Sequence, residues 1–286
     1  MTSNKMTTTT SLSTAFAFLL LSLPVSAQDD WKQWPTGQQW RIGAALFVPS
    51  LDTKLVVTDA EGIVGTGISF ENNLGLEDNK STVLVGVDWR FFKRHKVSFK
   101  YFDLQRDANA ESSVAILIGG EEIDITLPIQ SFFNISANEL SYSFSLLFDE
   151  RKDLYVGLGL SVQDLELGIR GTASNPEPGE TISSQLSTTA PLPTLNAGFN
   201  YAFTDKWMFV SQLGWLAVEA DFATDEKLEG QIINANIGIE WLAFKHAAFF
   251  AKYQVFDVDV DISDDDTIFA VDYDYQGPLL GVNVTF

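Results

Sequence analysis

Long stretches of the chain alternate apolar and polar residues with a period of two, which indicates β-strands rather than helices. In residues 83–91 every odd position is apolar, whereas Gly86, Asp88 and Arg90 share the opposite face. The same pattern recurs in residues 140–146, 195–203 and 233–241. A soluble β-sandwich would show this alternation too, so the pattern alone does not tell whether the apolar face meets a core or lipid.

Two features of composition favour contact with lipid. The polar faces consist mainly of Ser, Asn and Gly, which suit a narrow polar lumen better than a water-facing surface rich in Lys and Glu. Aromatic residues also gather where strands meet turns, as in the interfacial girdles of transmembrane barrels. These residues are Trp89, Phe91, Phe92, Phe148, Phe203, Trp207, Trp241 and Phe244. We therefore expect an all-β fold, an antiparallel transmembrane β-barrel.

The connections between strands are of two kinds, short basic turns and longer acidic loops. The short turns fall at residues 93–96, 149–153, 204–206 and 244–247. Transmembrane barrels have short turns on the periplasmic side and longer loops outside, and we expect both chain ends in the periplasm. These four turns then imply about ten strands. Eight strands is the alternative, because residues 62–70 are difficult to place.

On the strands that lead away from these turns, the alternation changes phase about eight to twelve residues past the turn. A tilted strand needs ~9–11 residues to cross a bilayer. Each strand then places an acid next to an aliphatic residue, as in Phe102-Asp103-Leu104 and Phe256-Asp257-Val258. We expect one-residue bulges there, at the outer rim. One hairpin, Val114 to Leu127, should project beyond the rim. It either packs against the protrusion from Leu55 to Phe70 or offers an apolar patch to an extracellular partner.

The first 27 residues have the pattern of an export signal peptide. Lys5 precedes a polar run, an apolar segment spans Ala15 to Leu23, and Val25-Ser26-Ala27 fits a cleavage site. We expect a periplasmic N-terminal segment over residues 28–39 and one barrel domain over residues 40–286. Without Lys5, the remaining 17 basic and 38 acidic residues give a formal charge of −21. This charge argues against nucleic acid as a partner, and the absence of cysteine excludes disulfide and thiol chemistry.

The last six residues, Gly281 to Phe286, alternate and end on an aromatic residue. Val282, Val284 and Phe286 would face lipid, while the residues between them face the lumen. This ending resembles the C-terminal signal strand of Gram-negative outer-membrane barrels, which implies export, insertion by the barrel assembly machinery and contact with lipid and lipopolysaccharide. In general character the chain resembles small barrels of the OmpW, OmpX and OmpA type, and the stretch from Gly65 to Leu76 is similar to the first of these.

Acidic residues alternate with apolar ones near the C-terminus, at Asp257, Asp259, Asp261, Asp272 and Asp274. If the apolar residues between them face outward, these carboxylates crowd one side of the upper lumen. The spacing is similar to that of a calcium loop, but Ile262 stands where such a loop requires glycine and Ile268 where it requires glutamate. An EF-hand is therefore excluded. A looser cation site and a solvated negative surface are the two interpretations that remain.

The two histidines, His95 and His246, both fall in short turns that we expect on the periplasmic side. Outer-membrane hydrolases generally place a histidine beside Asp or Ser at the outer rim, where imidazole can move a proton near neutral pH. We therefore expect no catalytic residue, no cofactor and no enzyme. The leading hypothesis is a structural envelope protein or a narrow conduit for small or hydrophobic solutes. An outer-leaflet hydrolase, of the protease or lipid A-modifying type, and an adhesin are the alternatives.

Overall fold

The computed structural model describes residues 35–59, 67–110, 114–118, 121–173, 181–221, 227–264 and 267–286. The predicted signal peptide, most of the predicted periplasmic segment and the acidic turn at residues 265–266 lie outside the described residues. Within the described ranges every regular element is a strand. No helix long and apolar enough to span a bilayer occurs there.

The strands pair in antiparallel fashion throughout, and most of them are long. Their bounds are β1 (Trp40–Phe47), β2 (Ser50–Asp59), β3 (Ile68–Ser69), β4 (Thr82–Phe92), β5 (His95–Ala110), β6 (Val114–Ile118), β7 (Glu121–Phe148), β8 (Lys152–Ala173), β9 (Thr181–Ala202), β10 (Trp207–Asp221), β11 (Lys227–Phe244), β12 (Ala247–Asp264) and β13 (Thr267–Thr285).

The prediction of a ten-strand barrel is confirmed, because β1 and β2 together act as one interrupted strand. β13 pairs with β1 near its C-terminal end and with β2 further up, while β1 also pairs with β4. Gly277 of β13 lies opposite the interruption, where an added Cβ would come 2.2 Å from the carbonyl oxygen of Val48. The backbones of Trp40 and Phe286 exchange two hydrogen bonds of 2.9 and 3.0 Å, which closes the cylinder.

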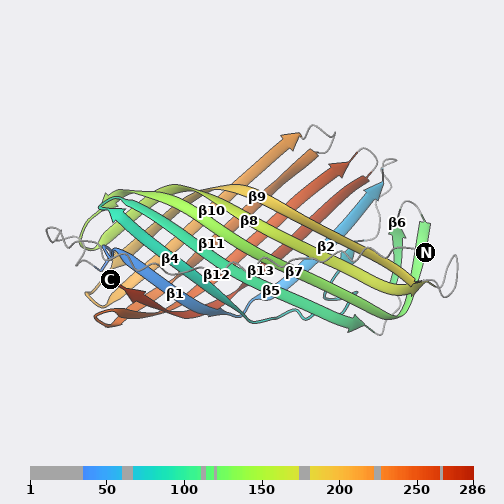
Figure 1. The fold of residues 1–286 in the computed structure, drawn as a ribbon, viewed down its shortest axis with the longest axis horizontal. Coiled ribbons are helices and arrows are strands. Elements are labelled where there is room, and N and C mark those ends of the chain that lie inside the picture. The colour runs from blue at the N-terminus through green and yellow to red at the C-terminus, as the bar shows by residue number, and fades with distance from the viewer. Residues whose placement is uncertain are drawn as a thin grey trace, which may run out of the picture.

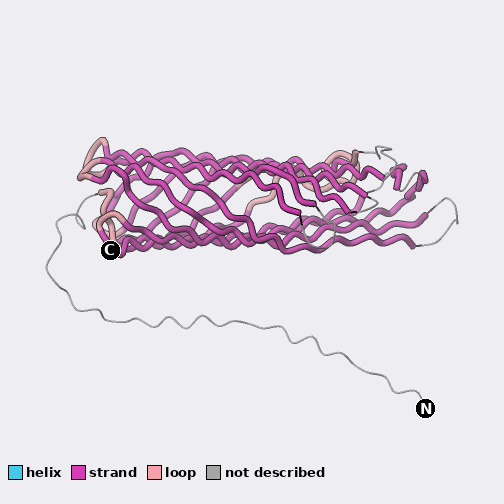
Figure 2. Tube along the Cα trace, turned by 90° about the horizontal axis from the view of Figure 1, so that it is seen from above, coloured by secondary structure: helices cyan, strands magenta, loops and turns pink. Residues whose placement is uncertain are grey.

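The predicted alternation determines which side chains point outward in the half of the barrel near the short turns. Val83, Val85 and Trp89 are exposed on the outside, whereas Arg90 is buried in the lumen. The same separation holds along the other strands, and it produces a belt of exposed apolar side chains around this half. All four predicted short turns lie at one end of the barrel, together with the C-terminus (Figure 2).

Beyond the belt the polarity of the two faces is exchanged without any change of register. On β7 the outward residues change from Tyr142 and Leu140 to Asn138 and Ser136. The inward residues change from serines to Ala137, Ile135 and Phe133, which are buried. The bulges that we predicted at this level are wrong: β5 pairs with β7, and β12 with β13, in unbroken register there. The phase change in the sequence reflects a change of surroundings, because the upper tube has water outside and an apolar core inside.

Above the belt the barrel wall divides into two lobes that diverge at the right of Figure 1. The first lobe contains β5, β7, β8 and β9, and the second contains β10 to β13 with β2 and β3. The pairing of β9 with β10 ends at Leu195 and Trp215. Higher on β9, Pro191 and Pro193 have no N–H to offer to a neighbouring strand, which suits an edge. On the other side, β4 begins only at Thr82, so the upper half of β5 pairs with β7 alone.

The inner faces of the two lobes pack against each other like the sheets of a β-sandwich. Phe133 of the first lobe packs against Tyr273 of the second with ring centroids 6.0 Å apart, and Phe102 packs against Tyr275 at 5.7 Å. Tyr273 also donates a 2.7 Å hydrogen bond to Gln163 across the interface. The structure is therefore a barrel in its lower half and a two-layer sandwich above.

The predicted hairpin from Val114 to Leu127 is present as the pairing of β6 with the start of β7, from Val114↔Ile125 to Ile118↔Glu121. It lies at the end of the molecule opposite the short turns (Figure 1). The side chains of this hairpin lie outside the described residues. Its packing against the stretch from Leu55 to Phe70 and its docking of a partner therefore stay predictions.

Candidate functional site

Buried ion pairs cross the lumen of the lower barrel at the turn end. Arg90 of β4, which is 3% exposed, forms an ion pair with Asp153 of β8 and donates a 3.0 Å hydrogen bond to Ser145 of β7. Arg41 of β1 lies 3.1 Å from Glu240 of β11, whose carboxylate is fully buried. These contacts join strands that are distant in the sheet order, and we call them the floor.

The middle of the lumen contains three adjoining cavities that are lined by both polar and apolar residues. The largest of the three, of about 100 Å³, is lined by Arg41, Asp88, Lys100 and Lys252 among others. A second, of about 50 Å³, shares Lys100 with it, and a third, of about 20 Å³, shares Glu139 with the second. The lower barrel is thus not filled completely by its own side chains, in contrast to the expectation for the smallest, eight-strand barrels.

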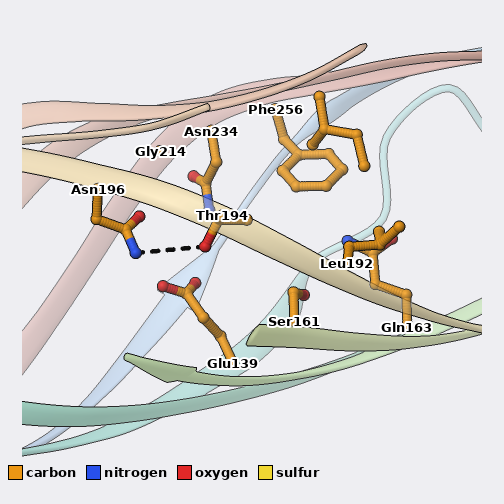
Figure 3. A pocket seen from close by; sticks show the side chains of 10 residues that line it. Glu139, Ser161, Gln163, Leu192, Thr194, Asn196, Gly214, Asn234 and Phe256 are labelled. Carbon is orange, nitrogen blue, oxygen red and sulfur yellow. Dashed lines mark hydrogen bonds between the residues drawn. The ribbon is translucent and has the colours of Figure 1, made fainter. Parts of the chain in front are cut away.

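The third cavity is shown from close by in Figure 3. Glu139 of β7 points towards Thr194 and Asn196 of β9, and Asn196 donates a 3.3 Å hydrogen bond to Thr194. Lys100 lies 3.6 Å from the Glu139 carboxylate and donates a 3.0 Å hydrogen bond to Gln212 of β10. This network connects the two sides of the lumen below the sandwich.

A segment from Phe70 to Glu77 lies between the two lobes, in contact with Phe133 and Ser131 of the first and Thr53 of the second, and we call it the plug. Phe70, Leu74 and Leu76 are buried in the core. Gly75 has a φ angle of 73°, a left-handed conformation that favours glycine, and it makes the sharp turn between the two leucines. From the sequence, residues 62–70 were difficult to place and Gly65 to Leu76 was similar to OmpW-type barrels, but a plug was not predicted.

Arg106 of β5 fixes the plug to both lobes. Its guanidinium forms an ion pair with Glu71, donates a 2.7 Å hydrogen bond to Thr53 of β2 and reaches the backbone oxygen of Glu77 at 3.3 Å. The other Glu71 oxygen accepts a 2.9 Å hydrogen bond from the Thr53 N–H. Arg106 is 1% exposed and lies over the Phe133 ring at 4.8 Å. This cluster bridges the gap that the short β4 leaves between β2 and β5.

The structure contradicts the prediction that an acidic cluster lines the upper lumen. Phe256, Val258, Tyr273 and Tyr275 point inward and are buried. The acids between them therefore point outward, at Asp257, Asp259, Asp261, Asp272 and Asp274. Above the belt the solvent lies outside, so an alternating strand turns its charged face that way. In the described part of the chain, no group of three or more Asp, Glu or His side chains is arranged to hold a metal ion.

Burial and crowding of like charges affect the acids on this outer face. Asp259 lies opposite Asp272, and Asp257 lies opposite Asp274, on neighbouring strands. Partial burial raises the pKa of Asp272, and the neighbouring carboxylates of Asp259 and Asp257 add to this effect. The pKa of Asp274 is raised in the same way, by burial first and then by the other acids. Lys54 of β2 opposes the effect, because it lies across from Asp272.

Both histidines lie at the turn end, as the sequence predicted. The His95 ring contacts the Tyr142 hydroxyl at 2.6 Å, and the His246 ring contacts the backbone oxygen of Thr285 at 2.9 Å. Neither is among the residues that line the three cavities. Val282, Val284 and Phe286 point outward and are exposed at the same end, in the orientation predicted for a signal strand. Their recognition by the assembly machinery stays a prediction.

Comparison with known proteins gives a fold but no close relative. No family model and no curated protein sequence matches the chain. Among solved structures, the outer-membrane protease OmpT of Escherichia coli matches with a TM-score of 0.55 and 11% identity, over 86% of this chain and 97% of that one. The outer-membrane protein OprG of Pseudomonas aeruginosa matches with a TM-score of 0.37 and 12% identity, over 87% and 96% of the two chains.

The chain has the fold of a bacterial outer-membrane β-barrel. The apolar belt is the surface that such a barrel turns to lipid. Stacked tryptophans mark the level of the short turns, Trp40 on Trp89 at 5.3 Å and Trp207 on Trp241 at 5.7 Å. Interfacial aromatic girdles of this kind flank the lipid-facing band of such barrels.

The sequence predicted a polar inward face that includes Asp88 and Arg90, but it missed the ion pairs and the cavities that such residues form. Arg106, Glu71 and Lys252 had attracted no attention, although one signal was available for the last of them. In Phe249-Phe-Ala-Lys-Tyr-Gln-Val255, alternation places Lys252 and Gln254 on the face opposite Tyr253. A lysine on the inner face of a lipid-crossing strand has to find a polar lumen, because the outside offers only hydrocarbon.

Proposed function

We propose that the protein is a non-enzymatic structural component of the outer membrane, a sealed barrel that carries a rigid two-layer stalk on the outer surface. The observation that carries this proposal is that buried side chains cross the interior of the protein at two levels. The floor is formed by buried ion pairs, and the ceiling is formed by the plug and the sandwich core. A wall of continuous strands connects the lipid belt to the stalk.

Chemistry at the outer surface has little support in the described residues. A hydrolase of the kind considered above needs a proton-transfer group near the outer rim, and both imidazoles lie at the turn end instead. The acids of the outer face are spread over a flat sheet surface rather than gathered in a cleft. Likeness to a protease at 11% identity concerns the fold alone.

Single-channel recording directly tests the proposal that the barrel is sealed. The full-length protein, without its signal peptide, would be refolded and inserted into planar lipid bilayers in a KCl solution. We expect no unitary conductance from the wild type, because ions would have to pass both the floor and the ceiling. Steady conductance steps from the wild type, absent from protein-free bilayers, would overturn the proposal.

A gated narrow conduit is the second candidate, and the cavities of the middle lumen favour it. These cavities hold polar groups that a small solute could contact once the plug moves aside. The discriminating variant replaces residues 70–77 by a Gly-Ser linker of equal length. Conductance from this variant, with a silent wild type, would support the gated conduit. Silence from both would leave the structural role.

A further inference from the structure

Inside the lower barrel, positively charged side chains outnumber negatively charged ones. The described lumen of the lower barrel contains the cations Arg41, Arg90, Lys96, Lys100 and Lys252. The acids in the same space are Asp88, Glu139, Asp153 and Glu240. A chain with a formal net charge of −20 thus has one more positive than negative charge in its most enclosed polar space.

Each of the four acids has a cation beside it, and Lys252 is the cation that remains. Glu240 pairs with Arg41, Asp153 with Arg90 and Glu139 with Lys100. Asp88 of β4 lies diagonally across from Lys96 of β5, since Asp88 is opposite Ser98 and Arg90 is opposite Lys96.

Lys252 points into the largest cavity and makes few contacts there. Within the described residues its ammonium forms no hydrogen bond or ion pair, and its described contact is with the Phe250 ring, 4.9 Å from the ring centroid. An ammonium group that leaves water without a partner costs several kcal/mol. The enclosed lumen therefore favours a species that brings the missing negative charge.

We propose that the cavity beside Lys252 is a binding site for a small oxyanion, of the carboxylate or phosphate class. Lys252 and Lys100 supply two ammonium groups to the same cavity, and both are hydrogen-bond donors only. Gln212 and Asn236 line it as well. Because the Gln212 side-chain oxygen accepts a bond from Lys100, its amide nitrogen remains as a donor. This binding site goes beyond the structural role proposed above and does not depend on it.

Size and chemistry restrict the ligand. The cavity of about 100 Å³ accommodates an acetate or a phosphate ion, while the buried ion pairs below it and the apolar core above it restrict the entry of polymers. Ammonium and amide donors bind the oxygen atoms of such anions through charge-assisted hydrogen bonds. The competing arrangement is internal: one oxygen of Glu240 has no hydrogen-bond partner, and a different rotamer of Lys252 would bring the ammonium towards it.

Refolding in the presence of the anion avoids the problem of entry into a closed lumen. The full-length protein without its signal peptide is refolded from urea into detergent with inorganic phosphate, with acetate, or with a bulky sulfonate buffer at equal ionic strength. Thermal unfolding is then followed for the wild type, Lys252→Met and Asp88→Asn. The control is Lys245→Met, which removes an exposed lysine in a short turn.

We expect phosphate or acetate to raise the Tm of the wild type and of Lys245→Met by roughly 5 °C relative to the sulfonate. The shift disappears in Lys252→Met and grows in Asp88→Asn, which removes a negative charge from the same cavity. A larger shift with phosphate identifies an inorganic ion as the better ligand, and a larger shift with acetate identifies an organic acid.

Two results would overturn the site. Equal Tm values of the wild type in all three anions would show that the cavity binds none of them. An anion-dependent shift that persists unchanged in Lys252→Met would place the anion elsewhere. If Lys252→Met lowers the Tm equally in every solution, the internal pairing of Lys252 with Glu240 is correct and the proposal is wrong.

Discussion

Arg106 and Glu71 form a buried ion pair that joins the first lobe to the plug, at the level where the barrel wall is interrupted. Both side chains also bind Thr53 of the second lobe, through its hydroxyl and its backbone N–H. The guanidinium therefore replaces the backbone pairing that is missing between β2 and β5. A charged cluster in an apolar core is strongly destabilised when one member is removed, because the other is left without compensation.

Arg106→Met should lower the free energy of unfolding by about 3–5 kcal/mol, since Glu71 remains buried without its partner. Urea unfolding in lipid vesicles, followed by tryptophan fluorescence, measures this change. The plug should also become cleavable by proteases in the folded protein. Lys80→Ala is the matched control, because it removes an exposed pair with Glu77 and should cost less than about 1 kcal/mol. Equal stability of Arg106→Met and the wild type would contradict the bridging role.

At the other end of the lumen, Asp153→Asn should destabilise the floor by about 3–5 kcal/mol, because Arg90 keeps its charge in a buried position. The same urea titration measures the effect. Asp205→Asn serves as the control, since Asp205 is exposed and forms a surface pair with Arg151 in the same set of turns. A similar loss of stability in both variants would mean that burial of the pair is not the cause.

The belt predicts that an arginine introduced at two heights on β8 has different effects on stability. Leu158 is 64% exposed and faces lipid, so Leu158→Arg should cost about 2–4 kcal/mol near the middle of the bilayer. Glu166 is exposed above the belt, where water surrounds the stalk, and Glu166→Arg should change stability little. Unfolding free energies in vesicles provide the comparison, and a large cost at Glu166 would place the membrane boundary higher than we propose.

The stability of the stalk should depend on pH through Asp272 and Asp274, whose pKa values are raised by burial and by neighbouring acids. A carboxyl group with a higher pKa in the folded chain favours folding at low pH. Its contribution is complete below the ordinary pKa of 3.8 and disappears as the pH rises through the raised value. Asp272→Asn should therefore unfold at a higher temperature than the wild type at neutral pH.

Thermal unfolding over a range of pH values tests this prediction. The difference between Asp272→Asn and the wild type should vanish in acid, where the wild-type carboxyl is protonated in both states. Asp107→Asn, on the outer face of the first lobe, is the control for the loss of one negative charge. An advantage of Asp272→Asn that is independent of pH would exclude the proposed cause.

The sequence predicts the lower barrel well because its signals are local. Alternation with a period of two, basic turns such as Lys93-Arg94 and the ending at Phe286 each depend on a few neighbouring residues. They locate the turn-side ends of the ten strands within a residue or two. Whether Asp257 points inward or outward could not be predicted from local signals. An alternating strand looks the same whether its apolar face meets lipid outside or a core inside, and only the height above the membrane decides between them.

The lobes and the plug depend on contacts between residues far apart in the chain. Phe70 meets Phe133, and Arg106 meets Glu71, with no local pattern that announces either contact. The cavities depend on how strands from all around the wall, β1, β4, β5 and β7 to β13, curve around the lumen, a property that no single strand encodes. The sequence therefore predicted the strands of the barrel and missed the plug, the ion pairs and the cavities inside it.

The exchange of polarity along unbroken strands means that the depth of the protein in the bilayer is written in outward side chains alone. On β5 these are Tyr101, then Asp103, Gln105 and Asp107. Replacing such residues by leucine on every strand would extend the apolar belt in steps of two residues. The base of the stalk would then lie deeper in the bilayer. Because most strands continue from the lipid belt into the stalk, the stalk keeps the same tilt as the barrel below it.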